Sequence, residues 1–505
     1  MNHLLLLLPL LIPLFGAIFC YFCLRMVTVQ KVIGLTAQLG LVFAAFRLLS
    51  TVDSEGIQVT QLGNWPAPFG ISLVADLFSG LMLVAGSVTG LAILLYSFTG
   101  LNRKRQGYGY YPLLLLLQFG INGACLTGDL FNLFVWFEVL LICCFVLISF
   151  GSTKAQLEGS IKYVTINFLA SGFLLMGIGI IYGITGTLNL AELGKLVQTE
   201  NVNAGLITMA SMFFLVALGI KAGLFPLFFW LPASYHTPPI AISAFIAGML
   251  TKVGMYALIR LFTLVFIMNA DYIHTILLVM AGFTMVIGVL GAASQTDFRK
   301  ILSFHIVSQI GYMLMGLAIF TPLAIAGSVF FILHNIFVKT NLFLISGIVE
   351  QQNGSFSLKK LGGVYLQRPL LALLFVIAAF SLAGIPPLSG FWGKFMLAKA
   401  GFEAGNTGIV ITSLIVSLLT TFSMTKIWNE VFWKDKPPVV IYPAEKTETV
   451  IAAQKPDKWL YVPVVLLTCV ILFMGLYAEA LVSLAMRAAG QLLHTETYIN
   501  AVLNP

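Results

Sequence analysis

Residues 205–230 read GLITMASMFFLVALGIKAGLFPLFFW, and Lys221 is the one ionisable side chain in this stretch. About 20 largely apolar residues are enough to cross a bilayer as an α-helix. Gly223 and Pro226 follow the lysine closely, and proline removes a backbone hydrogen-bond donor. At bilayer depth, unsatisfied backbone is tolerated only where it packs on protein or lines a polar cavity. The stretch therefore predicts a membrane-spanning helix that breaks beside a buried lysine.

Apolar windows of this length recur along the chain. Of its 505 residues, 59% are hydrophobic and 9% are charged, against roughly 25% charged in an average soluble protein. The first window follows the uncharged Met1-Asn2-His3, without the positive segment of a signal peptide. We expect one all-α polytopic membrane domain over residues 1–505, with a retained first helix. Its fourteen expected spans are 4–24, 32–50, 73–98, 111–128, 131–150, 161–185, 205–230, 240–266, 272–294, 301–320, 322–349, 369–401, 407–432 and 459–481.

Positive charge is distributed unevenly over the expected loops. The odd-numbered loops hold 17 of the 27 Lys and Arg residues, and cytoplasmic loops are the ones that retain positive charge. Both termini are therefore expected on the extracytoplasmic side, which agrees with an even number of spans. The 17 cations are Arg25, Lys31, Arg103, Lys104, Arg105, Lys154, Lys162, Arg299, Lys300, Lys359, Lys360, Arg368, Lys434, Lys436, Lys446, Lys455 and Lys458.

Composition also argues against several classes of function. A net charge of +8 would suggest nucleic-acid binding in a soluble protein, but topology accounts for most of these cations. The six cysteines lie almost entirely in apolar spans, without the paired spacing of a metal site. No glycine fingerprint of a nucleotide site follows a strand. We expect no nucleic-acid partner, no cofactor and no assignable metal site.

Several ionisable residues fall inside the expected spans. Placing an ionisable side chain inside the membrane costs about 3 kcal/mol or more of free energy. Such a residue is therefore expected to have a function. The deepest of them are Glu138, Lys221, Lys252 and Lys394, and His334 is also intramembrane.

For four further groups a structural interpretation stays open. Lys339 and Arg260 could simply join helices, as polar groups in membrane bundles often do. Asp76 and His305 lie near the ends of their spans, where an interfacial position is an alternative.

A second span repeats the combination of a helix break and a lysine. Gly384-Ile385-Pro386-Pro387-Leu388-Ser389-Gly390 precedes Lys394, so this helix is also expected to break. The two breaks lie about five spans apart, and interrupted helices at matching positions indicate a transport site in folds built from inverted repeats.

A mechanistic hypothesis follows from desolvation. A buried lysine gives up its proton more readily than one in water, and a nearby carboxylate restores its charged form. We expect Glu138 and Lys221 to form a pair whose opening drives the lysine's proton toward Lys252, His334 and Lys394.

Multi-residue motifs around these positions resemble a known family. They resemble the antiporter-like subunits of respiratory complex I and, among their relatives, the D subunits of bacterial Mrp-type sodium/proton antiporters. The resemblance covers essentially the whole chain. The motifs are Gly128-Asp129-Leu130-Phe131-Asn132-Leu133-Phe134, the run from Lys221 through Trp230-Leu231-Pro232 and His236-Thr237-Pro238-Pro239 to Lys252, Asp297-Phe298-Arg299-Lys300, Ser303-Phe304-His305-Ile306-Val307-Ser308-Gln309-Ile310-Gly311-Tyr312, and His334-Asn335-Ile336-Phe337-Val338-Lys339-Thr340-Asn341.

The resemblance implies a fourteen-helix fold with inverted five-helix repeats at roughly 111–266 and 272–432, and discontinuous seventh and twelfth helices. Some relatives end the proton chain with glutamate where this chain has lysine, which leaves the exit step open. The chain ends soon after its fourteenth span, so we expect no long lateral helix of the kind found in the largest family members. By position, the implied proton-translocating residues are Glu138, Lys221, Lys252, His334 and Lys394, with Lys339, His305 and His236 as secondary relay candidates.

The leading hypothesis is the proton-translocating subunit of a hetero-oligomeric sodium/proton antiporter in the bacterial cell membrane, with H⁺, Na⁺ and other antiporter subunits as partners. The alternative is a proton-pumping membrane subunit of a quinone-reducing or hydrogenase complex, because likeness of fold alone does not settle function. A passive scaffold is disfavoured by the cost of the buried lysines. No sodium site can be assembled from the sequence, since Asp76, Asp129 and Glu138 are dispersed.

Overall fold

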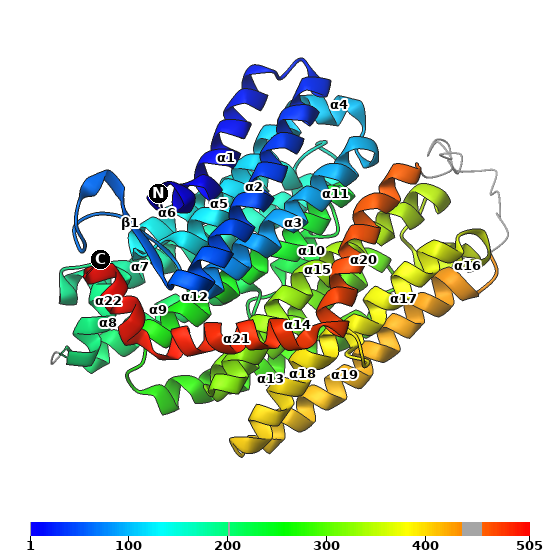
Figure 1. Cartoon of the computed structure of the whole chain (residues 1–505). Helices are drawn as coiled ribbons and strands as arrows, with labels where there is room; N and C mark the ends of the chain where they lie inside the picture. The colour runs from blue at the N-terminus through cyan, green and yellow to red at the C-terminus, as the bar shows by residue number, and fades with distance from the viewer. Residues whose placement is uncertain (1, 200–201, 437–456, 505) are drawn as a thin grey trace.

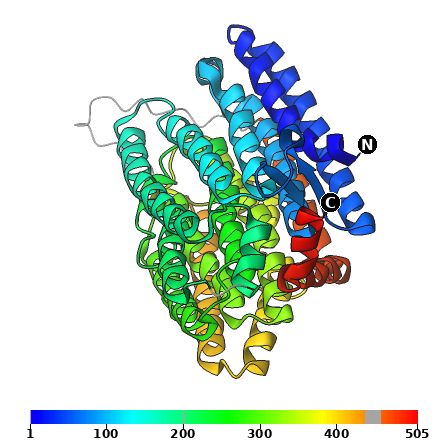
Figure 2. The same ribbon diagram turned by 90° about the vertical axis from the view of Figure 1, so that its left-hand side faces the viewer.

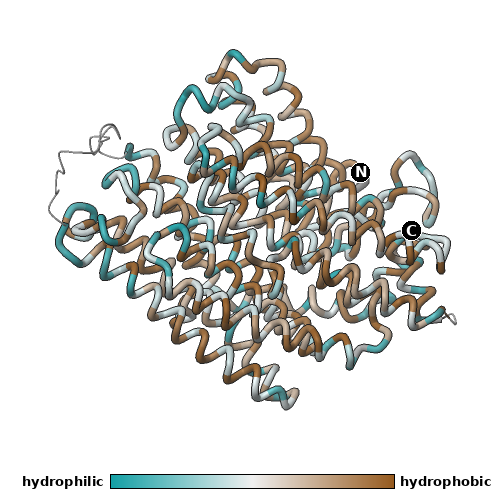
Figure 3. The backbone as a smooth tube through the Cα atoms, turned by 180° about the vertical axis from the view of Figure 1, so that it is seen from behind, coloured by the Kyte–Doolittle hydropathy of each residue, from teal (hydrophilic) through white to brown (hydrophobic). Residues whose placement is uncertain are grey.

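The computed structural model describes residues 2–199, 202–436 and 457–504. Two cations used for the expected orientation, Lys446 and Lys455, lie outside the described residues. The fold is a bundle of long helices with one small hairpin of strands (Figure 1). Figure 3 shows apolar residues along the helices and polar residues gathered at the connections between them.

Within the described part of the chain, thirteen helical segments are long and apolar enough to cross a membrane. The remaining expected span, 369–401, is divided between two shorter helices, α17 and α18, so every expected span has a counterpart. The spanning elements are α1 (Asn2–Phe22), α2 (Val27–Glu55), α3 (Leu77–Gly100), α4 (Arg103–Arg105) with η2 (Gln106–Tyr110) and α5 (Tyr111–Leu126), α6 (Leu130–Ile148), α7 (Lys154–Thr185), α9 (Ala204–Ala222), α11 (Ile240–Phe245) with η3 (Ile246–Leu250) and α12 (Thr251–Leu264), α13 (Ala270–Ser294), α14 (Phe298–Ile319), α15 (Pro322–Asn353), α17 (Pro369–Ala383), α18 (Ser389–Glu403), α19 (Thr407–Ile427) with η5 (Trp428–Trp433), and η6 (Lys458–Leu460) with α20 (Tyr461–Leu476).

Short elements connect these spans. Strands β1 and β2 pair antiparallel, with Gln58 opposite Ala75, and form a hairpin beside α1 and α22. These connecting elements are β1 (Gln58–Gln61), η1 (Leu62–Asn64), β2 (Ser72–Ala75), α8 (Leu190–Thr199), α10 (Trp230–Ser234), η4 (Leu358–Lys360), α16 (Val364–Gln367), α21 (Ala478–Leu493) and α22 (Thr495–Leu503).

Helices α14 and α15 form the centre of the bundle. Nearly every side chain of α15 is buried, because α3, α11, α14, α17, α18, α20 and α21 all pack against it. Peripheral helices instead expose large apolar side chains, such as Phe43 (69% exposed) on α2 and Leu418 (73% exposed) on α19. A surface of this kind fits a bilayer and not water.

Both expected helix breaks are confirmed. Helix α9 ends at Ala222 and α17 at Ala383, and each is followed by a glycine in the left-handed region, Gly223 at φ +82° and Gly384 at φ +90°. The caps have the same hydrogen bonds: the next residue's N–H reaches back five positions to a helix carbonyl, over 2.8 Å in the first cap and 3.1 Å in the second. This is the Schellman pattern, in which glycine is favoured because it has no Cβ.

The carboxyl-terminal residues form two helices that the sequence analysis did not assign. Helix α21 runs across the long helices instead of along them (Figure 1), and α22 turns back toward the hairpin (Figure 2). Helix α21 packs on α15, α3 and α12, and α22 packs on α8. The end of the chain therefore covers the bundle at the face where the hairpin lies.

Candidate functional site

Ionisable side chains on five different spanning segments form two groups, within each of which the charges interact: Glu138 with Lys221, and Lys252 with His334, Lys339 and Lys394. The first of them, Glu138, is carried by α6, whose first turn is capped by Asp129: its Oδ1 accepts from the N–H of Asn132 over 2.8 Å. Burial raises the pKa of Asp129. Glu138 lies nine residues further on and is partly exposed, yet its Oε1 is buried and has no hydrogen-bond partner within the described residues.

The lysine expected to pair with Glu138 lies near it without touching it. Lys221 is 5% exposed, and its Nζ donates to Ser171 Oγ over 3.3 Å and lies 4.9 Å from the centre of the Phe137 ring. Glu138 is close enough to act on Lys221 electrostatically, but no ion pair joins the two in the part of the chain that the structure describes. The Glu138 carboxylate and the Lys221 ammonium group therefore lie near each other without forming an ion pair.

Lys252 owes its position to a wide turn in its own segment. The π-helical turn η3 precedes it, and its Nζ donates to the carbonyl of Ala247, inside that turn, over 2.7 Å. Such π-helical turns often occur at functional sites. A Cβ on Gly254 would come within 2.9 Å of the backbone N of Ala222, so a glycine here lets α12 approach the end of α9 closely. Lys252 is thereby placed beside the broken helix that carries Lys221.

His334 connects the central helix α15 to both pieces of the second broken helix. Its Nδ1 lies 2.8 Å from Ser389 Oγ at the start of α18, and that hydroxyl lies 2.8 Å from Ser381 Oγ near the end of α17. His334 is fully buried, and its Nε2 has no partner among the described residues. One ring nitrogen is thus held by a hydroxyl group, and the other has no hydrogen-bond partner in the described part of the chain.

Lys394 reaches the end of α17, which is the first half of the second broken helix. Its Nζ donates to the carbonyls of Leu382 (3.2 Å) and Ala383 (2.9 Å) and to Ser417 Oγ (2.9 Å). The last carbonyls of a helix have no intrahelical donor and carry partial negative charge. The helix break therefore supplies the acceptors for this ammonium group, and Lys394 is partly exposed at the flank of the bundle.

Lys339 has the weakest polar contacts of the interior lysines. It is fully buried, and its Nζ reaches only the carbonyl of Leu302 at 3.5 Å. Lys252 and Lys394 are close enough to repel it, and Asp76 is the only carboxylate residue that is fully buried in the described chain. Unpaired charges are costly in such surroundings. Three lysines therefore lie within electrostatic reach of one another with little compensation from buried carboxylates in the described chain.

Two secondary candidates lie in different surroundings. His305 is fully buried within the bundle and bonds Ser423 Oγ through Nε2. His236 lies between α10 and α11, where its Nδ1 donates to the carbonyl of Pro232 over 2.8 Å, and burial lowers its pKa. It lines an open cavity of about 460 Å³ together with charged Glu158 and Lys300.

Several polar groups beside the site, and the partner of Asp76, were not predicted from the sequence. Asp76 caps the start of α3, is 1% exposed and forms an ion pair with Arg260, its Oδ2 2.6 Å from Nη2. Arg260 thus joins α12 to the start of α3, a contact of the kind considered for it in the sequence. Two of the unpredicted groups, the hydroxyls of Ser381 and Ser389, lie beside a predicted break, a signal that could have identified them. The other two, Ser171 and Ser417, lie in the middle of other spans and reach Lys221 and Lys394 only through packing.

A polytopic helical protein with protonatable side chains clustered at broken helices belongs to the class of ion-translocating membrane proteins. A family model described as NADH:quinone oxidoreductase/Mrp antiporter, transmembrane, matches residues 127–420. The chain belongs to this family.

Three similar proteins illustrate the relationship. The chain is 46% identical to the D subunit of the Na(+)/H(+) antiporter of Alkalihalophilus pseudofirmus over 100% of both chains. It superimposes with a TM-score of 0.92 on a chain of the Mrp complex from Dietzia sp. DQ12-45-1b, at 32% identity, covering 99% of this chain and 100% of that one. A chain of an archaeal membrane-bound sulfane sulfur reductase gives a TM-score of 0.89 at 26% identity, covering 99% and 100%.

Proposed function

We propose that this chain is the proton-translocating subunit of a multisubunit sodium/proton antiporter, a secondary transporter driven by the proton gradient. The observation that carries the proposal is the interior cluster of lysines at two broken helices, in a chain 46% identical over its whole length to the D subunit of such an antiporter. H⁺ is the ion that this chain handles, and Na⁺ is the exchanged ion of the whole complex.

The proposed proton path runs from Glu138 through Lys221, Lys252 and His334 to Lys394. Closing the separation between Glu138 and Lys221 would hold the proton on Lys221, and opening it would release the proton toward Lys252. Transfer along the interior is supported by the absence, among the described residues, of a fully buried carboxylate other than Asp76: an added proton on one lysine lowers the affinity of its neighbours for theirs. Lys339 and His305 extend the path as secondary groups, and His236 connects it to the charged cavity.

Two inverted repeats at roughly 111–266 and 272–432 would account for this arrangement. Both broken helices end in the same glycine cap. In addition, α6 and α14 both begin after a capping aspartate, Asp129 and Asp297, and each aspartate forms an isolated β-bridge, to Asn189 and Ser357 respectively. His305 lies eight residues after its cap and Glu138 nine, so the two groups take similar places in the two halves.

The protein would work in the bacterial cell membrane beside other subunits. Glu138 and Lys394, the two ends of the path, are partly exposed, whereas Lys252 and His334 between them are buried. Partly exposed residues at the two ends of the path are suited to exchange protons with a neighbouring subunit. The distribution of cations supports a topology with both termini on the extracytoplasmic side.

A redox complex is the second candidate, because the family also contains subunits of quinone-linked enzymes. The greater identity to the antiporter subunit, 46% against 26% for the sulfane sulfur reductase chain, favours antiport.

The test compares two lysines on the same helix. Lys394→Gln should abolish sodium-dependent dissipation of a pH gradient in everted vesicles that contain the whole complex. Lys399→Gln, which removes only an exposed ion-pair partner of Glu403, should leave it within about twofold. Wild-type exchange in an assembled Lys394→Gln complex would refute the proposal.

A further inference from the structure

The buried ion pair between Asp76 and Arg260 is not used by the path described above. Arg260 lies on α12, eight residues after Lys252, with Tyr256 midway between them. Residues four apart face the same way along a helix. One face of α12 thus carries a lysine, a tyrosine and an arginine in order, starting at the interior cluster and ending at the pair.

The contacts around the pair form a continuous polar network. Arg260 Nη2 lies 2.6 Å from Asp76 Oδ2 and donates to the Tyr256 hydroxyl over 3.3 Å, and that hydroxyl donates to the Cys125 carbonyl over 2.6 Å. Asp76 Oδ1 accepts from the N–H of Ser79 over 2.9 Å. The charged and titratable groups that act on this site are Asp76, Arg260, Tyr256, Tyr498 and Cys125.

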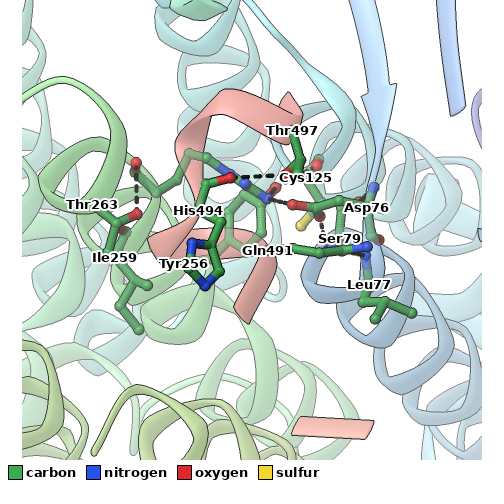
Figure 4. A network of polar contacts seen from close by, with 11 residues as sticks. Asp76, Leu77, Ser79, Cys125, Tyr256, Ile259, Thr263, Gln491, His494 and Thr497 are labelled. Atoms are coloured by element: carbon green, nitrogen blue, oxygen red, sulfur yellow. Dashed lines mark hydrogen bonds and ion pairs between the residues drawn. The ribbon is translucent and has the colours of Figure 1, made fainter. Parts of the chain in front are cut away.

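The carboxyl-terminal helices close this network from outside the bundle. The Tyr498 ring of α22 lies 5.3 Å from the Arg260 guanidinium group. Gln491 of α21 accepts a hydrogen bond through Oε1 from the N–H of Leu77, the residue after Asp76, over 2.9 Å. Figure 4 shows Asp76, Tyr256 and Gln491 converging from three separate elements. The pair is therefore the last buried charged site between Lys252 and the face covered by α21 and α22.

We propose that Asp76 is a proton-accepting group that links Lys252 to this face, with Arg260 as its positioning residue and α21 and α22 as its cover. The inference rests on the proposed function. A proton leaves the Lys252 ammonium group, passes the level of Tyr256 and binds the Asp76 carboxylate, which then releases it to water at the covered face. Arg260 stays charged throughout and holds the Asp76 carboxylate in place between transfers.

A relay and a purely structural ion pair make different predictions for a charge-balanced double variant. Removing one partner of a buried pair is strongly destabilising, whereas replacing both together can be neutral. If the pair is only structural, Asp76→Asn combined with Arg260→Gln should restore transport. If Asp76 carries the proton, the double variant should assemble and still exchange at least about tenfold more slowly than the wild type.

The experiment measures sodium-dependent pH-gradient dissipation in everted vesicles with the whole complex, together with the amount of this chain and its partners in the membrane. Asp53→Asn is the matched control, because Asp53 forms an exposed ion pair with Arg487 of α21, and it should leave the rate within about twofold. We expect Asp76→Glu, which keeps a carboxylate, to retain most of the transport of the wild type.

Wild-type exchange by the double variant would overturn the inference. Its loss from the membrane would also overturn it, because a structural pair alone would then account for both residues. Lys221→Gln in the same vesicles distinguishes failure of this inference from failure of the proposed function. If that variant is inactive while the double variant is active, only this inference fails, whereas full activity of Lys221→Gln would refute the proposed function itself.

Discussion

Gly384 controls the position of the Lys394 ammonium group, so Gly384→Ala should damage transport more than it damages folding. The residue sits at φ +90°, where a side chain costs about 1–2 kcal/mol. Its new Cβ would lie 2.8 Å from Lys394 Cδ, closer than two carbon atoms can approach. The lysine stem must therefore move away from the carbonyls that hold its Nζ.

The size of the effect follows from the contacts that this shift breaks. Lys394 Nζ donates to the Ala383 carbonyl over 2.9 Å and to the Leu382 carbonyl over 3.2 Å, and a hydrogen bond to a charged group contributes about 1.5–3 kcal/mol. Loss of one such bond corresponds to about a 10- to 100-fold change. We expect Gly384→Ala to lower exchange by at least about tenfold, while the chain is still present in the membrane.

Gly405→Ala provides the matched control. Gly405 also has a positive φ, +73°, but nothing lies within 4 Å of the Cβ that alanine would add. The backbone cost is therefore similar, and Lys394 is not displaced. Sodium-dependent dequenching of a pH indicator in everted vesicles, normalised to membrane protein, gives both rates. Equal rates for Gly384→Ala and Gly405→Ala would refute the claim that the carbonyls at the helix break position the ammonium group.

Three further predictions concern the rest of the path. Glu138→Gln should nearly abolish exchange without loss of assembly, because Lys221 then lacks the carboxylate that retains its proton; an active, assembled variant would contradict this. Ser389→Ala should lower the exchange rate several-fold, because it removes the hydroxyl 2.8 Å from His334 Nδ1. Ser389→Thr keeps the hydroxyl and should exchange faster than Ser389→Ala; equal rates would contradict this role. Burial lowers the pKa of His236. The imidazole therefore stays neutral through the pH range in which histidine ordinarily titrates and gains a proton only at lower pH. His236→Gln should therefore leave the alkaline side of the pH profile unchanged and alter only the acidic side, and a change confined to alkaline pH would disprove that role.

The spans and the helix breaks could be predicted because their causes are local. Twenty apolar residues in a row suffice to predict a span, and Gly223 and Pro226 are enough to predict a break, since they act on their own backbone. The interior lysines could be predicted for the same reason: their cost in a membrane is evident from the type of residue alone.

The contacts of the path depend on packing between distant segments and could not be predicted in this way. Ser417 meets Lys394 only because α19 lies beside α18, and Lys252 reaches the Ala247 carbonyl only through the π-helical turn η3. The ion pair of Asp76 could not be foreseen either, because its partner Arg260 is 184 positions away in sequence. Helices α21 and α22, which cover that partner, carry too few consecutive apolar residues to be recognised by hydropathy.

We propose that protons pass through the interior lysines during sodium exchange, and sodium-driven proton movement in proteoliposomes that contain the purified whole complex with Lys221→Gln tests this. Lys399→Gln is the control, because it alters only an exposed pair with Glu403. We expect proton movement at background level for Lys221→Gln and within about twofold of the wild type for Lys399→Gln. Wild-type proton movement through an intact Lys221→Gln complex would contradict the proposed path.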